Sequence, residues 1–102
     1  MDSNELNEQI LAARNRAARL LSYRPMSTGE LRRKLIQKGE PPYAADDAVE
    51  FLVECGFLDD AEYAALVVRH YSAKGYNDWR IRQELRRHLV PPDYWNDALD
   101  SL

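Results

Sequence analysis

The chain of 102 residues has a single cysteine, Cys55, and lacks any apolar run near the ~20 residues that a membrane-spanning helix needs. One cysteine excludes an internal disulfide and is typical of the reducing cytosol. The first residues lack the charged-then-apolar pattern of a signal peptide. The four glycines are scattered, so no glycine-rich phosphate loop is present. These absences predict a small cytoplasmic protein with no membrane association.

Side chains suited to catalysis or to metal binding are also few. His70 and His88 lie on different predicted helices, and no histidine or asparagine motif accompanies Cys55. The nearest group of carboxylates, at residues 46–50, has the pattern of a surface cluster and not of a metal site. We expect no enzyme activity, no cofactor, no metal and no small-molecule substrate. Cys55 is interpreted as a small, half-buried hydrophobic residue at the end of a helix.

The charges are distributed unevenly along the chain. The net charge is −3, yet all 14 lysines and arginines lie in two windows, residues 14–38 and 69–88. Most of the acidic residues lie outside these windows, with a dense group at residues 46–62. A chain that alternates between basic and acidic segments either has two differently charged faces or contains a repeat.

A repeat is supported when the sequence is aligned with itself at an offset of 50 residues. Arginine, leucine, proline and aspartate recur without a gap, and the double proline at 41–42 and 91–92 is the most specific match. The identical pairs are Arg19/Arg69, Ser22/Ser72, Arg32/Arg82, Leu35/Leu85, Pro41/Pro91, Pro42/Pro92, Asp47/Asp97, Ala48/Ala98 and Leu52/Leu102. A period of this length indicates a duplicated helical unit.

Each unit has the pattern of three helices. In the first unit, apolar or small residues recur at helical spacing over residues 6–21. Ser27 and Glu30 then form a capping box, and the helix they start ends at Gly39. The third helix follows the double proline and ends at Gly56. The core residues predicted for this third helix are Ala48, Val49, Leu52 and Val53.

The second unit repeats this pattern. Asp59 and Glu62 resemble another capping box, the helix ends at Gly75, and Asn77 or Asp78 caps the next one. The predicted core residues are Tyr63, Val67, Tyr71, Ile81, Leu85, Leu89, Trp95, Ala98, Leu99 and Leu102. The sequence therefore predicts an all-α fold of two tandem three-helix repeats, similar to helix-turn-helix units. We place the repeats at residues 1–56 and 57–102 of one continuous domain.

The middle helix of each repeat carries a cluster of basic residues, and the third helix is acidic. The candidate partner-binding residues are Arg32, Arg33, Lys34, Lys38, Arg80, Arg82, Arg86, Arg87 and the neighbouring Trp79. One interpretation is a solvated surface with ion pairs such as Arg32–Asp47, which stabilise little. The other is a strip that binds phosphate or an acidic surface, for which the guanidinium group is well suited. The second interpretation fails if carboxylates within each repeat neutralise these cations.

Four segments carry a family resemblance: STGELRRKLIQKG at residues 27–39, GFLDDAEYA at 56–64, KGY at 74–76 and RIRQELR at 80–86. In this order and spacing they resemble the RecX family of bacterial regulators of the RecA recombinase. The resemblance covers most of the chain. It implies a non-catalytic protein of tandem three-helix repeats that binds RecA filaments on single-stranded DNA. It also implies inhibition of RecA activity and thus modulation of recombination, DNA repair and the SOS response.

The sequence departs from the family pattern in two places. Family members usually have a third repeat, whereas this chain has two, which puts filament-spanning affinity in doubt. Many also have a second glycine and a proline after the KGY segment, where this chain has Asn77-Asp78. The alternative functions are a helix-turn-helix DNA-binding protein and an α-repeat adaptor for an unrelated protein. Single-stranded DNA is a further candidate partner.

Overall fold

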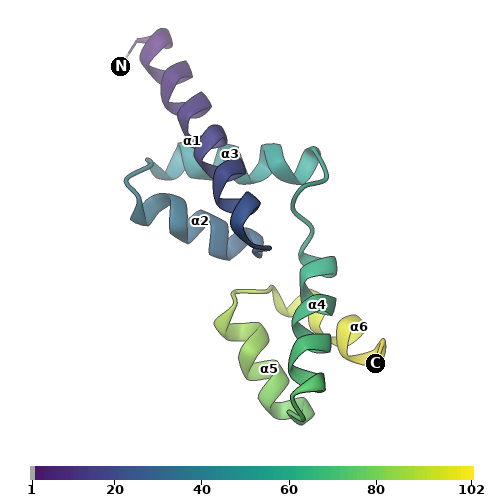
Figure 1. The fold of residues 1–102 in the computed structure, drawn as a ribbon. Helices are drawn as coiled ribbons and strands as arrows, with labels where there is room; N and C mark the ends of the chain where they lie inside the picture. Colours follow the sequence, from purple (N-terminus) through teal and green to yellow (C-terminus); the bar gives the residue numbers. More distant parts are fainter. Residues whose placement is uncertain (1) are drawn as a thin grey trace.

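The fold, which a computed structural model describes for residues 2–102, consists of helices. They are α1 (Ser3–Tyr23), α2 (Thr28–Gln37), α3 (Pro42–Glu54), α4 (Asp60–Ala73), α5 (Asp78–Arg87), a 3-10 turn η1 (Pro92–Tyr94) and α6 (Trp95–Asp100). Helices α1–α3 pack as one unit and α4–α6 as a second, with the termini at opposite ends (Figure 1). The molecule is elongated, with extents of 52 × 23 × 23 Å. The predicted all-α fold of two tandem three-helix repeats is confirmed.

The structural repeat keeps the offset found in the sequence. Helices α2 and α5 begin and end 50 positions apart, and so do the ends of α1 and α4. The third helices differ, because α3 is continuous whereas its counterpart is the turn η1 followed by the short helix α6. The middle helix is therefore the element whose two ends match most closely between the repeats.

Local capping chemistry sets where the helices begin. The Ser27 hydroxyl accepts a hydrogen bond from the backbone N–H of Glu30 at 3.0 Å, and the Glu30 carboxylate accepts one from the Ser27 N–H at 3.1 Å. This is the predicted capping box. At α4, the Asp59 carboxylate accepts from the N–H of Glu62 at 3.1 Å. The residue that caps α5 is Asn77.

Each repeat has its own apolar core. The first consists of residues from α1, α2, α3 and the adjoining loops: Ala13, Ala17, Met26, Leu31, Leu35, Ala44, Ala45, Ala48, Leu52 and Leu58. The second consists of Tyr63, Ala64, Val67, Val68, Ile81, Leu85, Val90, Trp95, Ala98 and Leu99. Small alanines let α3 approach α1 closely, and the Trp95 indole donates to the carbonyl of Val90 at 2.9 Å. The two cores are separate clusters, so packing within each does not by itself orient one repeat against the other.

Three of the predicted buried positions are wrong. Val53 is 44% exposed because the buried face of α3 consists of Ala44, Ala45, Ala48 and Leu52, and Val53 lies outside it. Leu102 is 63% exposed because α6 has already ended. Cys55, expected to be half-buried, is exposed in the turn that follows α3. The predicted core omitted Ala44 and Ala45, which are fully buried. Alanine carries a weak hydropathy signal, so spacing alone did not reveal these two.

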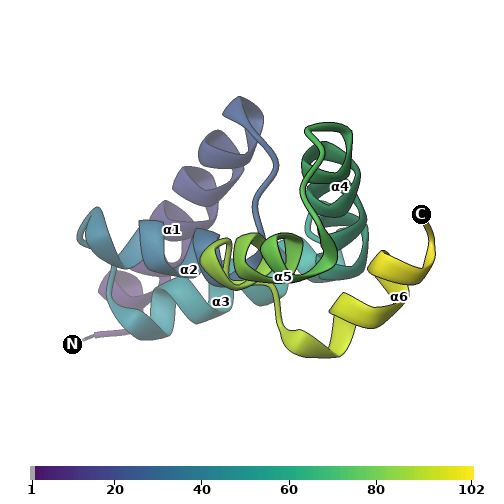
Figure 2. The ribbon, with the colours of Figure 1, turned by 90° about the horizontal axis from the view of Figure 1, so that it is seen from below.

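The two repeats meet through polar groups at the first turn of α2. The buried Ser27 hydroxyl donates to the carbonyl of His88, at the end of α5, at 2.6 Å. The N–H and hydroxyl of Thr28 donate to the two carboxylate oxygens of Asp60, the first residue of α4, at 2.9 and 2.7 Å. Figure 2 shows α5 of the second repeat next to α2 of the first, where the Ser27 bond to His88 forms. Directional hydrogen bonds therefore set how one repeat sits on the other.

Close backbone packing accompanies these bonds. Leu89 has a φ of +58°, the one positive φ at a non-glycine residue between residues 2 and 102, whereas its counterpart in the first repeat is Gly39. A left-handed conformation at leucine costs about 1–2 kcal/mol and persists where neighbours enforce it. Leu89 packs directly against Gly29 of α2, which has no side chain to keep it away. A Cβ added at Gly29 would lie 2.9 Å from the Cβ of Leu89 and 3.1 Å from its carbonyl oxygen.

Gly29→Ala is therefore expected to destabilise the protein by about 1–3 kcal/mol, as overpacking does elsewhere. The clash outweighs the usual gain in helix propensity from glycine to alanine. The free energy of unfolding in urea measures the effect.

Leu89→Gly provides the control, because it removes the obstructing side chain. In a double-mutant cycle, Gly29→Ala should cost less in the Leu89→Gly background than in the wild type. Equal costs in both backgrounds would show that Gly29 and Leu89 are not coupled.

Candidate partner-binding site

The nine candidate binding residues lie on the two middle helices or at their ends. All are exposed except Arg82, which is half-buried. Trp79 is 67% exposed at the start of α5 and therefore belongs to the surface and not to the core. The cations differ from one another in what surrounds them.

Three of the arginines form ion pairs within their own repeat. The pairs are Arg32–Asp46 at 2.5 Å, Arg82–Asp78 at 2.6 Å and Arg87–Glu84 at 2.7 Å. The arginine side chains in these pairs remain 38–64% exposed. Exposed pairs contribute ~0–1 kcal/mol, so a partner anion can compete for these guanidinium groups.

The predicted pair Arg32–Asp47 is wrong. Asp46 accepts from Arg32 instead, and both carboxylate oxygens of Asp47 accept from Arg14 of α1, at 2.8 and 3.1 Å. The prediction considered α2 and α3 alone. The fold brings α1 across α3, which supplies a bidentate partner that sequence spacing does not reveal.

Two further arginines of α5 lie over aromatic rings. The guanidinium carbon of Arg80 is 3.8 Å from the centroid of the Tyr76 ring, and that of Arg86 is 5.6 Å from the centroid of Trp95. Cation–π contact orients an arginine and leaves its N–H donors available. Both side chains remain exposed.

Several of the remaining cations converge at the boundary between the repeats. Arg33, Lys34 and Gln37 of α2 face Arg87 of α5 across a hollow of about 190 Å³, which we name the junction hollow. Its other lining residues are Arg24, Glu30 and Leu89. Among the described residues, neither Arg33 nor Lys34 has an ion pair or hydrogen-bond partner for its side chain. Sequence reasoning identified three of the four cations and missed Arg24, which precedes the turn before α2.

The carboxylate beside this hollow is held ionised by its neighbours. Oε2 of Glu30 lies 3.2 Å from Nδ1 of His88 and 3.4 Å from Nη2 of Arg24. Burial acts to raise the pKa of Glu30, but hydrogen bonds from Tyr63, the Ser27 N–H and His88 together lower that pKa below its ordinary value of 4.5. Burial and the proximity of Glu30 raise the pKa of Tyr63. Glu30 thus joins α2 to α4 and to the end of α5.

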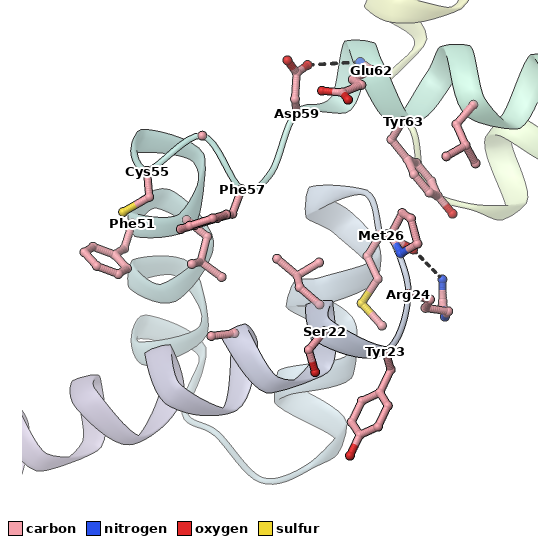
Figure 3. A pocket seen from close by; sticks show the side chains of 16 residues that line it. Ser22, Tyr23, Arg24, Met26, Phe51, Cys55, Phe57, Asp59, Glu62 and Tyr63 are labelled. Carbon is pink, nitrogen blue, oxygen red and sulfur yellow. Dashed lines mark hydrogen bonds between the residues drawn. The ribbon is translucent and has the colours of Figure 1, made fainter.

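A second, larger hollow of about 790 Å³ lies where α1 ends, α3 ends and α4 begins; we name it the apolar groove. Figure 3 shows Phe57, on the connection from α3 to α4, across the groove from Met26 and Tyr63. Phe57 is 73% exposed and Tyr23 80%. Exposed apolar surface of this kind can contact another macromolecule. The basic clusters alone gave no indication of this groove.

Comparison with known proteins identifies relatives for both repeats. The family model described as "RecX, first three-helix domain" matches residues 13–52, and that of "RecX, second three-helix domain" matches residues 59–99. The chain is 42% identical over 77 residues to Regulatory protein RecX of Vibrio cholerae serotype O1, covering 76% of this chain and 51% of that protein. It is 45% identical over 84 residues to Regulatory protein RecX of Xanthomonas axonopodis pv. citri, covering 82% and 52%.

A third relative, Regulatory protein RecX of Leptothrix cholodnii, is 38% identical over 96 residues, which is 94% of this chain and 60% of that protein. The chain thus spans about half the length of the curated relatives it matches. Within residues 2–102, no helix combines the length and apolar character that crossing a membrane requires.

Glu30→Gln is expected to lower the free energy of unfolding at pH 7 by about 1–3 kcal/mol, because hydrogen bonds to a charged group are lost. The pKa of Glu30 is lowered in the folded state, so its charge stabilises the protein above pH ~4.5, the ordinary pKa of glutamate. That contribution disappears as the pH falls through the folded-state pKa. Urea unfolding at a series of pH values should show wild type and variant converging below pH ~4.5.

Glu62→Gln is the matched control, since Glu62 is an exposed carboxylate on α4. It should leave the free energy of unfolding almost unchanged at pH 7. If both variants lost the same free energy of unfolding, the role given to Glu30 in joining α2 to α4 and α5 would be contradicted.

Proposed function

The chain belongs to the RecX family, and from that membership we propose that it is a non-catalytic cytoplasmic regulator that binds RecA filaments on single-stranded DNA and inhibits the recombinase. The observation that carries the proposal is the match of both three-helix repeats to successive RecX domains, in order and over most of the chain. The relatives are named regulatory proteins. RecA is therefore the partner that the family name favours.

The surface chemistry supports this proposal. Exposed cations on α2 and α5 give the two repeats related basic faces, and a filament presents the same surface at regular intervals. Two linked contacts bind more tightly than one, because the second forms at a high effective concentration. The proposed contact residues are Arg32, Arg33, Lys34, Lys38, Arg80, Arg82, Arg86, Arg87 and Trp79.

The acidic third helices weigh against the helix-turn-helix alternative. Recognition helices of that class are normally the second of a closely turned pair and read base edges in the major groove. Here the basic helix α2 precedes α3, which carries Asp46, Asp47, Glu50 and Glu54. Asp46 and Asp47 are paired with arginines, but Glu50 and Glu54 would repel the phosphates of duplex DNA.

The test is the rate of ATP hydrolysis by RecA on single-stranded DNA in the presence of increasing amounts of this chain. We expect the rate to fall at or below one chain per RecA subunit. An unchanged rate at a several-fold excess would remove the proposed function. Binding of duplex DNA without RecA, falling steeply as salt increases, would instead support the helix-turn-helix alternative.

The variant Arg82→Gln/Arg86→Gln tests the basic face of α5. Inhibition should require at least about tenfold more protein, because loss of one charge-assisted contact is worth 1.5 kcal/mol or more. The variant Arg69→Gln/Lys74→Gln removes the same number of charges from exposed positions near the C-terminal end of α4. It should inhibit as the wild type does. Equal weakening by both variants would overturn the role given to α5.

A further inference from the structure

The junction hollow has a positive charge that no group among residues 2–102 balances. Arg33 and Lys34 both line the hollow with no partner for either side chain among the described residues, and Arg24 and Arg87 add two more cations. The one carboxylate of the hollow, Glu30, is already engaged with Arg24 and His88, and Arg87 is paired with Glu84. The hollow is therefore electropositive even after its internal ion pairs are counted.

The donors around the hollow suit a tetrahedral oxyanion. Guanidinium groups bind phosphate oxygens in pairs, an ammonium group supplies a point charge, and the side-chain amide of Gln37 adds a neutral N–H donor. The hollow of about 190 Å³ is open to solvent and much larger than the space that one water molecule needs, so it can admit a phosphate group.

The second repeat does not have basic residues at the positions that match Arg33 and Lys34. At the 50-residue offset, Arg33 corresponds to Gln83 and Lys34 to Glu84. The unpaired cations are thus specific to the place where α2 of the first repeat faces the end of α5 of the second. The site is composite, because it needs Arg33 and Lys34 from one repeat and Arg87 from the other.

We propose that the junction hollow is a phosphate-binding site that joins the two repeats. The anion would be held by Arg33, Lys34 and Arg87, with Arg24 at its edge. Binding relieves repulsion among these cations and adds a bridge between α2 and α5, so it stabilises the packing of one repeat on the other. This inference deepens the proposed function by giving its basic surface a ligand class, and it is testable without RecA.

The experiment uses the full chain in two arms. In the first, inorganic pyrophosphate is titrated into isotope-labelled protein, and the backbone amide signals of Gly29 and Leu89, at the junction, are followed by NMR. In the second, fluorescence anisotropy measures binding of a labelled oligothymidylate over a series of salt concentrations. Saturable shifts of the junction signals in the first arm identify a site for free phosphate. Oligothymidylate binding that is lost when Arg33 and Lys34 are substituted identifies a site for a nucleic-acid phosphate.

The diagnostic variant is Arg33→Gln/Lys34→Gln, and the matched control is again Arg69→Gln/Lys74→Gln. Both remove one arginine and one lysine from exposed positions, so both change the net charge equally. The diagnostic variant should bind the responsive ligand at least tenfold more weakly, and for oligothymidylate the salt slope should fall by about 1.4, since each lost phosphate contact on a single strand changes it by ~0.7. The control should bind within about twofold of the wild type.

Three results would overturn the inference: equal effects of both variants, absence of junction shifts and oligothymidylate binding in the wild type, or tighter binding of a polyglutamate peptide than of either phosphate ligand. The last would assign the hollow to carboxylates of a protein partner. A free energy of unfolding in urea no lower than that of the wild type confirms that the diagnostic variant is folded. Inhibition of RecA by the wild type without phosphate binding at the junction would remove the inference and leave the proposed function intact, whereas phosphate binding by the wild type without inhibition would keep the inference and remove that function.

Discussion

The arrangement of the two repeats depends on the first turn of α2. The start of a helix leaves backbone N–H groups without intrahelical partners. Here those groups, and the side chains around them, bond to the second repeat as well as to one another. The Ser27 hydroxyl accepts from Glu30 and donates to His88, and Thr28 gives both of its donors to Asp60. Because the apolar cores are separate, these directional bonds decide the angle at which the repeats meet.

The same junction explains why two copies of one module have come to differ. At the left-handed position after the middle helix, the first repeat has Gly39, which adopts that conformation freely. The second has Leu89, whose side chain packs on Gly29 across the junction. Only the second copy of this position lies against the other repeat, so only there does a larger side chain gain contacts that offset backbone strain. The contact with the other repeat, and not the helix end itself, therefore explains why this position is leucine in one repeat and glycine in the other.

Much of the fold could be predicted because its signals are local. Capping residues such as Ser27 and Asn77, and the left-handed Gly39, mark helix ends through contacts with a few neighbouring residues. The 50-residue offset reveals the duplication by direct comparison of the two halves. The binding surface could be predicted only in part, because whether a cation is free depends on the tertiary structure. Arg14 reaches Asp47 from 33 positions away, and the convergence of Arg33 with Arg87 depends on a junction that no spacing rule describes.

The ion pairs change the meaning of the duplicated basic clusters. Arg32 and Arg82 are equivalent positions, and each is paired with an aspartate, Asp46 in the first repeat and Asp78 in the second. The aspartates are not equivalent, so each repeat acquired its own means of balancing the same cation. Arg33 and Lys34, which have no carboxylate partner among the described residues, have uncharged or acidic counterparts in the other repeat. A duplication that served only to present two identical strips would leave equivalent residues free. The structure leaves non-equivalent residues free, and two of them, Arg33 and Lys34, lie where the two repeats meet, which makes the junction a part of this surface that neither repeat could form alone.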